Sequence, residues 1–357
     1  IQSSQPDGNG HFGISVDVVD EIIAVGNFKA DLEDIVEAGK AHVYNSSGDH
    51  LMTLQSPEPD EKHRFGYMVA LGDEIIIASQ LRGTIQGVMN AGSVHIYDFE
   101  GVHLSTFLSP SMKINACFGN SLDASDELIL IGEFGDLRRA TLIGPGSVYI
   151  FDYNGNLVTT LISPDPEDKA CFGCSVYING DKIVVGELYA MVDGKNRAGK
   201  AYIFDTDGNL LQTLKSPTVE ENAEFGCAVA INEDKIVVGE QQGDVENINE
   251  GKVYVFNLNG TLLATLKAPK PEIGAQFGYS VATNGENVVV GEFGAEAAGE
   301  SNAGKVYILD LGSGAKSETK PKPDDPSTKP ENGVPGFPVN AVFSGILVTT
   351  FLVYYLS

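Results

Sequence analysis

The chain has 357 residues, of which 42% are hydrophobic, so it holds enough apolar side chains for a large folded core. Its 49 Asp and Glu residues outnumber its 23 Lys and Arg residues and give a formal net charge of -26. Such a chain repels phosphate groups, which excludes nucleic acid as an expected partner but leaves cations, basic proteins and neutral glycans open.

One sequence unit recurs along residues 1–311. A Phe-Gly pair opens each copy, and successive pairs are 53, 53, 54, 53 and 52 residues apart. The six phenylalanines are Phe12, Phe65, Phe118, Phe172, Phe225 and Phe277. A fixed period of this length indicates a repeat architecture rather than several unrelated domains.

Each unit is expected to form four short β-strands. In residues 225–268 the apolar runs FGCAVAI, KIVVG, GKVYVFN and TLLATLKAP are separated by Asn, Asp, Gly and Pro, which favour turns. No copy has the 3.6-residue periodicity of an amphipathic helix. Six such units in a ring predict an all-β fold, a six-bladed β-propeller of four-stranded blades over residues 1–311.

The ring needs a closing strand, because the sixth copy ends at Leu311 after only three strands. Residues 1–7, IQSSQPD, align with residues 54–60, LQSPEPD, when both are counted back from the next Phe-Gly pair. We therefore predict that the N-terminal strand completes the last blade.

The pattern FGxSV…IVVG…AGKVYVF resembles the FG-GAP repeats of integrin α-subunit propellers and of many prokaryotic surface proteins. The resemblance covers residues 1–311 and implies a propeller fold. In that family several blades carry a calcium loop, DxDxDG, between the first and second strands. Here the corresponding turns, at residues 18–21, 71–74 and 179–182, are too short to wrap Ca²⁺ in six to eight oxygens.

One polar residue follows the second strand of each blade. The six are Asn27, Gln80, Glu133, Glu187, Glu240 and Glu292. Two interpretations are open. The side chains form a ring of oxygen ligands for Ca²⁺ or Mg²⁺ near one mouth of the central channel, or each caps its own loop through backbone N–H groups.

The loops after these residues are long and differ in every blade: residues 27–39, 80–92, 133–146, 187–199, 240–251 and 292–304. The connections between blades emerge on the same face and are acidic, as in residues 57–64, 164–169 and 217–224. Long variable loops on a rigid scaffold usually carry binding, so we expect a protein or glycan ligand on this long-loop face.

Cysteines and possible glycosylation sites recur at equivalent positions of the copies. Cys117 and Cys171 precede the Phe of their pairs, whereas Cys174 and Cys227 follow it by two residues. They are either buried free thiols or the disulfides Cys117–Cys171 and Cys174–Cys227. The sequons at Asn45 and Asn259 lie in hairpin turns of the opposite face, where glycans would leave the long-loop face free.

Four histidines occupy two repeated slots. His42 and His95 stand in the third strand, where later blades have Tyr, and His50 and His103 stand in the fourth. His42 is expected to face His50 across a hairpin of blade 1, and His95 to face His103 across a hairpin of blade 2. The two histidines of a blade are either a two-His metal site or ordinary surface residues. No nucleophile elbow, HExxH or phosphate loop is present, so we do not expect an enzyme.

The C-terminal part has a different composition. Residues 312–335 are rich in Pro, Ser, Thr and Lys and are expected to be an extended linker. Residues 336–357 are hydrophobic, and the uncharged run 339–356 is long enough for a membrane-spanning helix. The residues just before this run, Val-Pro-Gly-Phe-Pro at 334–338, resemble the Pro-Gly-Phe sorting tails of archaeal surface proteins. The same segment could instead mediate self-association.

These features predict an extracellular, C-terminally anchored cell-surface protein that binds or adheres through its long-loop face. The first alternative is a structural subunit of a filament or surface layer, assembled through residues 336–357. The second is a propeller enzyme that acts on glycans.

Overall fold

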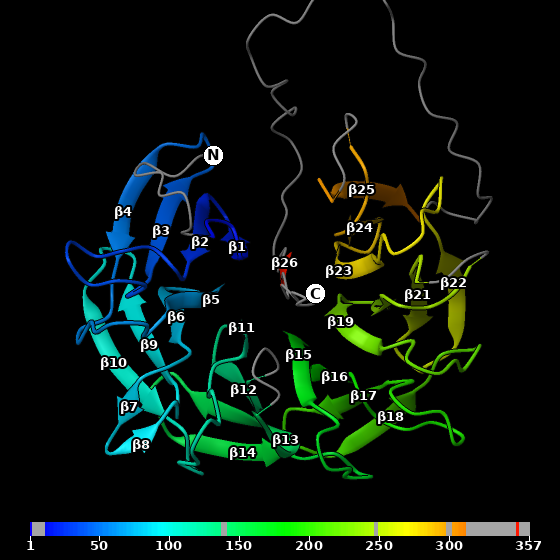
Figure 1. Cartoon of the computed structure of the whole chain (residues 1–357), viewed down its shortest axis with the longest axis horizontal. Coiled ribbons are helices and arrows are strands. Elements are labelled where there is room, and N and C mark those ends of the chain that lie inside the picture. The colour runs from blue at the N-terminus through cyan, green and yellow to red at the C-terminus, as the bar shows by residue number, and fades with distance from the viewer. Residues whose placement is uncertain (2–10, 137–140, 246–248, 298–301, 312–347, 350–357) are drawn as a thin grey trace, which may run out of the picture.

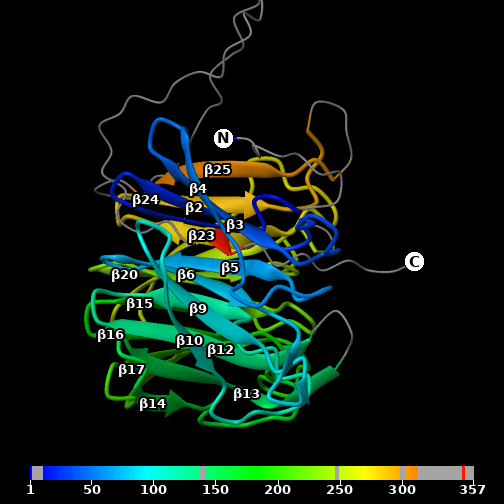
Figure 2. The ribbon, with the colours of Figure 1, turned by 90° about the vertical axis from the view of Figure 1, so that its left-hand side faces the viewer.

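The computed structural model describes residues 1, 11–136, 141–245, 249–297, 302–311 and 348–349. All the regular elements in these ranges are β-strands, and most of them form six sheets around a common axis (Figure 1). Seen from the side, the inner strands run through the thickness of the disc (Figure 2). The predicted six-bladed β-propeller is therefore confirmed.

The strands of the six blades follow in chain order. Blade 1 contains β1 (Ser15–Val19), β2 (Ile22–Asn27), β3 (Lys40–Asn45) and β4 (His50–Leu54). Blade 2 contains β5 (Phe65–Leu71), β6 (Ile75–Gln80), β9 (Ser93–Asp98) and β10 (His103–Leu108), with the small hairpin β7 (Thr84–Ile85) and β8 (Val88–Met89) in its long loop. Blade 3 contains β11 (Ser121–Ala124), β12 (Leu128–Asp136), β13 (Thr141–Asp152) and β14 (Leu157–Leu161).

Blades 4 and 5 repeat this order. Blade 4 contains β15 (Phe172–Asn179), β16 (Lys182–Glu187), β17 (Lys200–Asp205) and β18 (Leu210–Leu214). Blade 5 contains β19 (Phe225–Ile231), β20 (Lys235–Glu240), β21 (Lys252–Asn257) and β22 (Leu262–Leu266). Blade 6 has three strands, β23 (Phe277–Thr283), β24 (Asn287–Glu292) and β25 (Lys305–Asp310).

The hydrophobic core lies between neighbouring blades. The phenylalanine of the Phe-Gly pair is fully buried in blades 2 to 6. In blade 4, Phe172 packs edge-on against Phe204 with an interplanar angle of 90° and lies beside Tyr202. Phe225 makes the same contacts with Phe256 and Tyr254 in blade 5. One aromatic cluster per blade thus explains why the phenylalanine recurs.

The repeated glycines are explained by close contact between backbones of adjacent blades. Gly199, at the start of β17, has φ +86°, and a Cβ there would lie 2.0 Å from the carbonyl oxygen of Phe225 in the next blade. Gly226 has φ +87°, and its Cβ would lie 2.3 Å from the carbonyl oxygen of Lys200. Any side chain would force the two blades apart, so both Gly positions recur.

The predicted closure of the ring can be followed only at Ile1, because residues 2–10 lie outside the described residues. A Cβ on Gly48 of blade 1 would lie 3.7 Å from Ile1 Cγ1. In the next blades the equivalent glycines Gly101 and Gly208 approach Leu54 and Leu161, which end the outer strands of the preceding blades. Ile1 therefore lies beside the hairpin turn of blade 1. Among the described residues, the sheet of blade 6 contains only β23, β24 and β25, so its completion by the N-terminal strand stays a prediction.

The predicted linker, residues 312–335, lies outside the described residues. So does the predicted helix of residues 336–357, except for β26 (Val348–Thr349), which pairs with β1. Among the described residues, no helix is long and apolar enough to cross a membrane. The turns between first and second strands are short, with two residues separating β1 from β2 and β15 from β16.

Candidate functional site

The long loops and the connections between blades meet on one face, as predicted. Each of the connections into blades 2 to 6 hydrogen-bonds to the long loop of the preceding blade. For example, Lys62 N donates to Val36 O at 2.9 Å, and Asn222 N donates to Asn196 O at 2.9 Å. Ion pairs reinforce this contact. Arg197 Nη2 lies 2.5 Å from Glu224 Oε1. The loops therefore form a continuous surface fixed to the scaffold.

Part of the acidic charge of this face is neutralised internally. The first residue of the third strand is Lys in blades 4, 5 and 6, and each Lys reaches an acid of the connection that enters its own blade. Lys200 Nζ lies 3.1 Å from Asp165 Oδ2, Lys252 Nζ lies 2.8 Å from Glu220 Oε1, and Lys305 Nζ lies 2.5 Å from Glu272 Oε1. These acids therefore hold the connections in place and are less available to a ligand.

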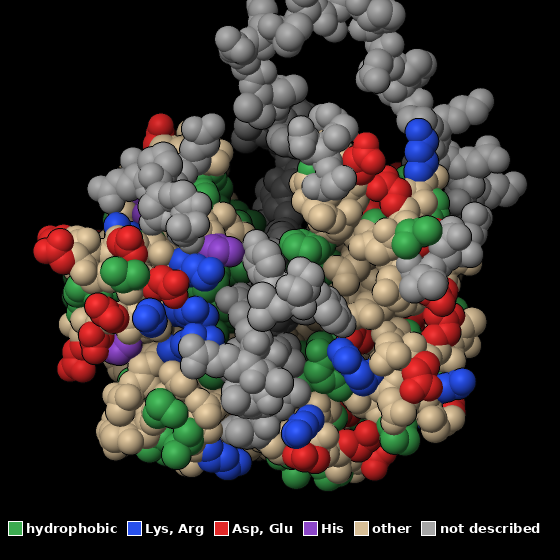
Figure 3. Space-filling view, viewed as in Figure 1, with side chains coloured by type: hydrophobic (Ala, Val, Ile, Leu, Met, Phe, Trp, Pro, Cys, Tyr) green, Lys and Arg blue, Asp and Glu red, His purple; other side chains and the backbone are tan. Residues whose placement is uncertain are grey.

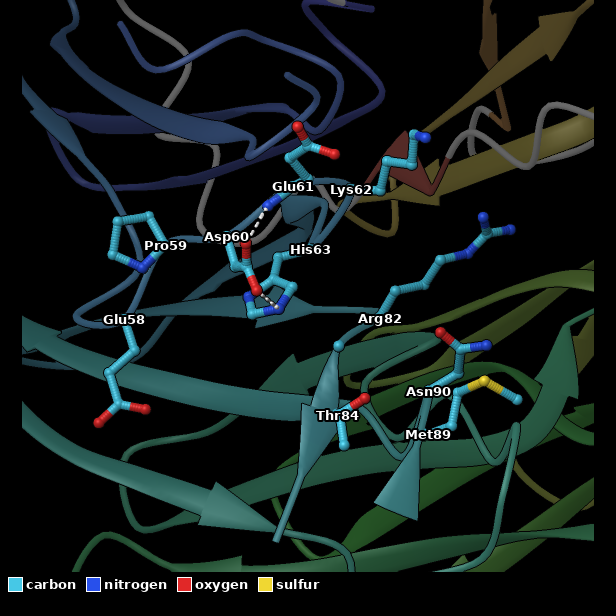
Figure 4. Close-up of a pocket in the computed structure, with 11 residues that line it drawn as sticks. Glu58, Pro59, Asp60, Glu61, Lys62, His63, Arg82, Thr84, Met89 and Asn90 are labelled. Atoms are coloured by element: carbon cyan, nitrogen blue, oxygen red, sulfur yellow. Dashed lines mark hydrogen bonds and ion pairs between the residues drawn. The ribbon is translucent and has the colours of Figure 1, made fainter. Parts of the chain in front are cut away.

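A cavity of about 570 Å³ opens on the long-loop face between blades 1 and 2 (Figure 4). Two segments form it: the blade 1–2 connection and the long loop of blade 2, which carries the β7–β8 hairpin. The lining residues are Glu58, Pro59, Asp60, Glu61, Lys62, His63, Arg82, Gly83, Thr84, Met89 and Asn90. All of these residues lie in the connection 57–64 and the long loop 80–92, which the sequence placed on the expected binding face without showing that the two segments form a cavity.

Charge is unevenly distributed around this cavity. Lys62 and Arg82 project to the same side, and Glu61 lies beside Lys62, whereas Glu58 points away from them (Figure 4). Lys and Arg side chains gather over blades 1 and 2 on this face, while acidic side chains are spread along its rim (Figure 3). A local positive region on a strongly acidic chain is suited to an anionic group of a ligand.

His63 lies at the centre of the cavity. Its side chain is 14% exposed, and its Nε2 lies 3.7 Å from Asp60 Oδ2. A Cβ on Gly83, which has φ +121°, would lie 3.0 Å from His63 Nε2 and 3.3 Å from Gln80 Nε2. The glycine therefore allows the long loop to fold closely over the histidine.

The six polar residues that follow the second strands are all buried, with at most 3% of their surface exposed. Four of them accept a hydrogen bond from the third-strand tyrosine of their own blade. The O···O distances are 3.4 Å for Tyr149–Glu133, 2.5 Å for Tyr202–Glu187, 3.0 Å for Tyr254–Glu240 and 2.7 Å for Tyr307–Glu292. The other two, Asn27 and Gln80, occur in the blades whose third strand has histidine instead.

The structure thus places these residues inside the blades, and it gives the four glutamates a tyrosine partner that the sequence analysis did not assign. Among the described residues, no three His, Cys, Asp or Glu side chains gather in a group that could hold a metal ion. The bonds go to side chains and not to the loop N–H groups expected for capping. The sequence contains this pairing. Every copy with Glu at the end of the second strand has Tyr in the third strand, and the two copies with Asn or Gln there have His in the third strand.

Burial changes the acidity of these carboxyl groups. It raises the pKa of Glu240 to about 7, because desolvation outweighs the hydrogen bonds from Ser216 and Tyr254 and the charge of Lys252. Burial raises the pKa of Glu187 and Glu292 for the same reason. One oxygen of each of these three carboxyl groups is buried without a hydrogen-bond partner. A proton on the carboxyl group removes the buried charge, so burial shifts the equilibrium of each group toward the protonated form.

The predicted histidine pairs do face each other. The ring centroids of His42 and His50 lie 5.8 Å apart, and those of His95 and His103 also lie 5.8 Å apart. Each pair shares a threonine hydroxyl between its rings: Thr106 Oγ1 lies 3.0 Å from His95 Nδ1 and 3.1 Å from His103 Nε2. Burial, together with the charges of His103 and His63, lowers the pKa of His95 to about 3.

The four cysteines are buried free thiols, so the two conceivable disulfides are not formed. Two of the thiols are directed at the next blade: Cys174 Sγ donates to Gly226 O at 3.4 Å, and Cys227 Sγ donates to Gly278 O at 3.3 Å. Of the two sequons, Asn259 is exposed, whereas Asn45 is half-buried and its side-chain amide donates to Asp49 Oδ2 at 3.0 Å.

Residues 156–204, 211–256 and 261–309 match the family model described as FG-GAP repeat. Each match begins just before or within the outer strand of one blade and ends in the third strand of the next. These matches and the propeller fold support the FG-GAP resemblance found in the sequence. A comparison with curated protein sequences found no match.

Two solved structures are similar to the chain, each at 14% sequence identity. The Pan2 WD40 domain of Neurospora crassa gives a TM-score of 0.49, with 82% of this chain and 73% of that chain covered. BamB from Moraxella catarrhalis gives a TM-score of 0.43, with 85% of this chain and 74% of that chain covered.

Proposed function

We propose that the chain is a binding protein of the cell surface that holds its ligand on the long-loop face, at the cavity between blades 1 and 2. The observation that carries this proposal is the cavity itself. It is formed by two loops of blades 1 and 2, is lined largely by charged and polar side chains, and lies beside a local concentration of positive charge.

The contrast with the rest of the scaffold supports this choice. The repeated polar residues of blades 3 to 6 are occupied by bonds inside their own blades, and three lysines neutralise connection acids. By contrast, Lys62 and Glu61 are exposed at the cavity and come from a connection whose sequence differs from the others. Positions free of a structural role are those that can be used for recognition.

A binding screen tests this proposal. The full chain is applied to arrays of acidic and neutral glycans and of peptides, with and without Ca²⁺, and hits are measured by calorimetry. Lys62→Glu should weaken binding of a cavity ligand at least tenfold. The matched control Lys182→Glu, at the start of β16, should leave binding unchanged. Equal effects of both variants, or binding insensitive to Lys62→Glu, would contradict the proposal.

A filament or surface-layer subunit is the second candidate, and one observation favours it. The outer edge of β25 has no partner strand among the described residues, and its apolar side chains are exposed. An unpaired edge is a template for adding a strand from another chain. Electron microscopy of the protein from native cell surfaces distinguishes single discs from regular fibres or lattices.

A further inference from the structure

Blade 6 presents an open, apolar strand edge. In β25, Val306 is 71% exposed and Ile308 is 60% exposed. Their equivalents in blade 5, Val253 and Val255, are 0% and 1% exposed, because β22 covers them through the pairs Val253↔Leu266 and Val255↔Ala264. Ile1 stands at the far end of this edge, beside Gly48, but leaves both side chains uncovered. Blade 6 therefore has an acceptor site for one more strand.

The other five blades show which sequence this site accepts. Their outer strands and preceding turns share one pattern: Gly, any residue, His or Leu, Leu or Val, any residue, Thr, then Leu or Phe. It occupies residues 48–54, 101–107, 155–161, 208–214 and 260–266.

Three positions of this pattern have identifiable roles. The glycine adopts positive φ in the hairpin turn, for example +84° at Gly155. The threonine pairs with the third-strand His or Tyr, as Thr265 does with Tyr254. The last residue is buried, as at Leu161 and Leu214, which are both 2% exposed.

The same pattern occurs once more in the chain, at residues 345–351, GILVTTF. Its central tetrapeptide, LVTT, is identical to residues 157–160 in the outer strand of blade 3. We propose that this segment is the fourth strand of blade 6 and docks on the edge of β25. By analogy with β21 and β22, Leu347 would face Leu309, Thr349 would face Ile308, and Thr350 would face Tyr307.

Docking on β25 would give residues 345–351 more strand pairs than the pairing of Val348 and Thr349 with β1 provides. In the structure, Val348 and Thr349 pair with β1 through two residue pairs, Val16↔Val348 and Ser15↔Thr349. An outer strand in the register of β22 makes four pairs with its neighbour. It would also cover the exposed apolar side chains of Val306 and Ile308, and burial of such side chains stabilises a fold. Residues 312–344 easily span the gap, because neighbouring strands lie only about 5 Å apart.

Cysteine crosslinking of the full chain tests this docking. Ile308→Cys with Thr349→Cys joins positions that face each other in the proposed register, whereas Ser15→Cys with Thr349→Cys joins the pair next to β1. After mild oxidation, a gel and peptide masses identify each disulfide. The four native thiols are buried, and burial raises the pKa of Cys174 and Cys227, so they should compete little.

The proposal expects an intrachain 308–349 disulfide in most molecules and little 15–349 disulfide. Thr349→Pro should abolish protection of the Ile308 amide in hydrogen exchange, because proline cannot continue a strand ladder, while Ser327→Pro in the linker should not. A dominant 15–349 disulfide would overturn the proposal. So would 308–349 crosslinks formed only between two copies, or partition of residues 345–351 into membranes. None of these outcomes bears on ligand binding at the cavity of blades 1 and 2.

Discussion

The phenol of Tyr202 donates a 2.5 Å hydrogen bond to Glu187 Oε2, and both side chains are buried between the second and third strands of blade 4. The same pair recurs in blades 3, 5 and 6. In blade 1 its place is taken by Asn27 and His42, whose Nδ2 and Nε2 atoms lie 3.5 Å apart. The residue types at these two positions therefore change together from blade to blade, because a buried carboxyl group needs a hydrogen-bond donor beside it.

Removing the donor should destabilise the propeller. Tyr202→Phe leaves Glu187 Oε2 without its hydroxyl partner, so we expect a loss of about 1–3 kcal/mol in the free energy of unfolding. The double change Glu187→Gln with Tyr202→His recreates the combination found in blade 2 and should recover part of that loss. Urea titrations measure all three proteins. A double variant no more stable than Tyr202→Phe would contradict this pairing.

The stability of the fold should depend on pH through Glu240. Burial raises its pKa to about 7 in the folded protein from an ordinary value of 4.5. Since the folded pKa is the higher one, the stability of the protonated form is lost as pH rises from about 4.5 to 7. A shift of this size corresponds to about 3 kcal/mol.

The variant Glu240→Gln isolates this contribution. Urea titrations between pH 4.5 and 8 should show a smaller fall in stability with rising pH for the variant than for the unchanged chain. Parallel curves for the two proteins would show that Glu240 does not titrate in this window. Glu61→Gln, at an exposed position of the cavity, is the matched control and should leave the pH dependence unchanged.

His95 should stay neutral over the physiological range. Burial and the neighbouring His103 and His63 lower its pKa to about 3, from an ordinary value of 6.5. Because the folded pKa is the lower one, His95 destabilises the fold progressively as pH falls from about 6.5 to 3. In NMR titrations its ring signals should not move between pH 5 and 8. A midpoint near 6.5 would show that the ring is hydrated and not buried.

The close approach of blades 4 and 5 makes Gly199 irreplaceable. In Gly199→Ala the new Cβ would lie 2.0 Å from Phe225 O, so the blades must separate, at a cost of more than about 3 kcal/mol. Gly194→Ala is the matched control. Gly194 also has positive φ, +80°, but no atom lies within 4 Å of its Cβ position, so only about 1 kcal/mol of backbone strain is expected. Melting temperatures compare the two, and similar losses would refute the steric argument.

The four cysteines should be inert in the folded protein. All are buried, and burial raises the pKa of Cys171, Cys174 and Cys227, which suppresses the reactive thiolate. A colorimetric thiol reagent should therefore label none of them in buffer and four per chain in guanidinium. Fewer than four labelled thiols in denaturant without reductant would reveal a disulfide.

The fold of residues 1–311 could be predicted from the sequence. The period of about 53 residues and the turn residues between short apolar runs located nearly every strand, and the Phe-Gly pairs marked where each blade begins. The strands and the blade boundaries can be predicted because they depend on local or repeated sequence. The pattern found in one blade recurs in the other copies.

The contacts of the repeated polar residues could not be predicted from the sequence and became visible in the folded protein. Position along the chain shows that Glu187 ends a strand, but it does not show whether the carboxyl group faces the channel or Tyr202. That direction depends on the register of β16 and β17, in which Glu187 pairs with Lys200 and Val185 with Tyr202. The cavity around His63 likewise arises from two loops separated in sequence, which approach each other because the propeller brings adjacent blades into contact.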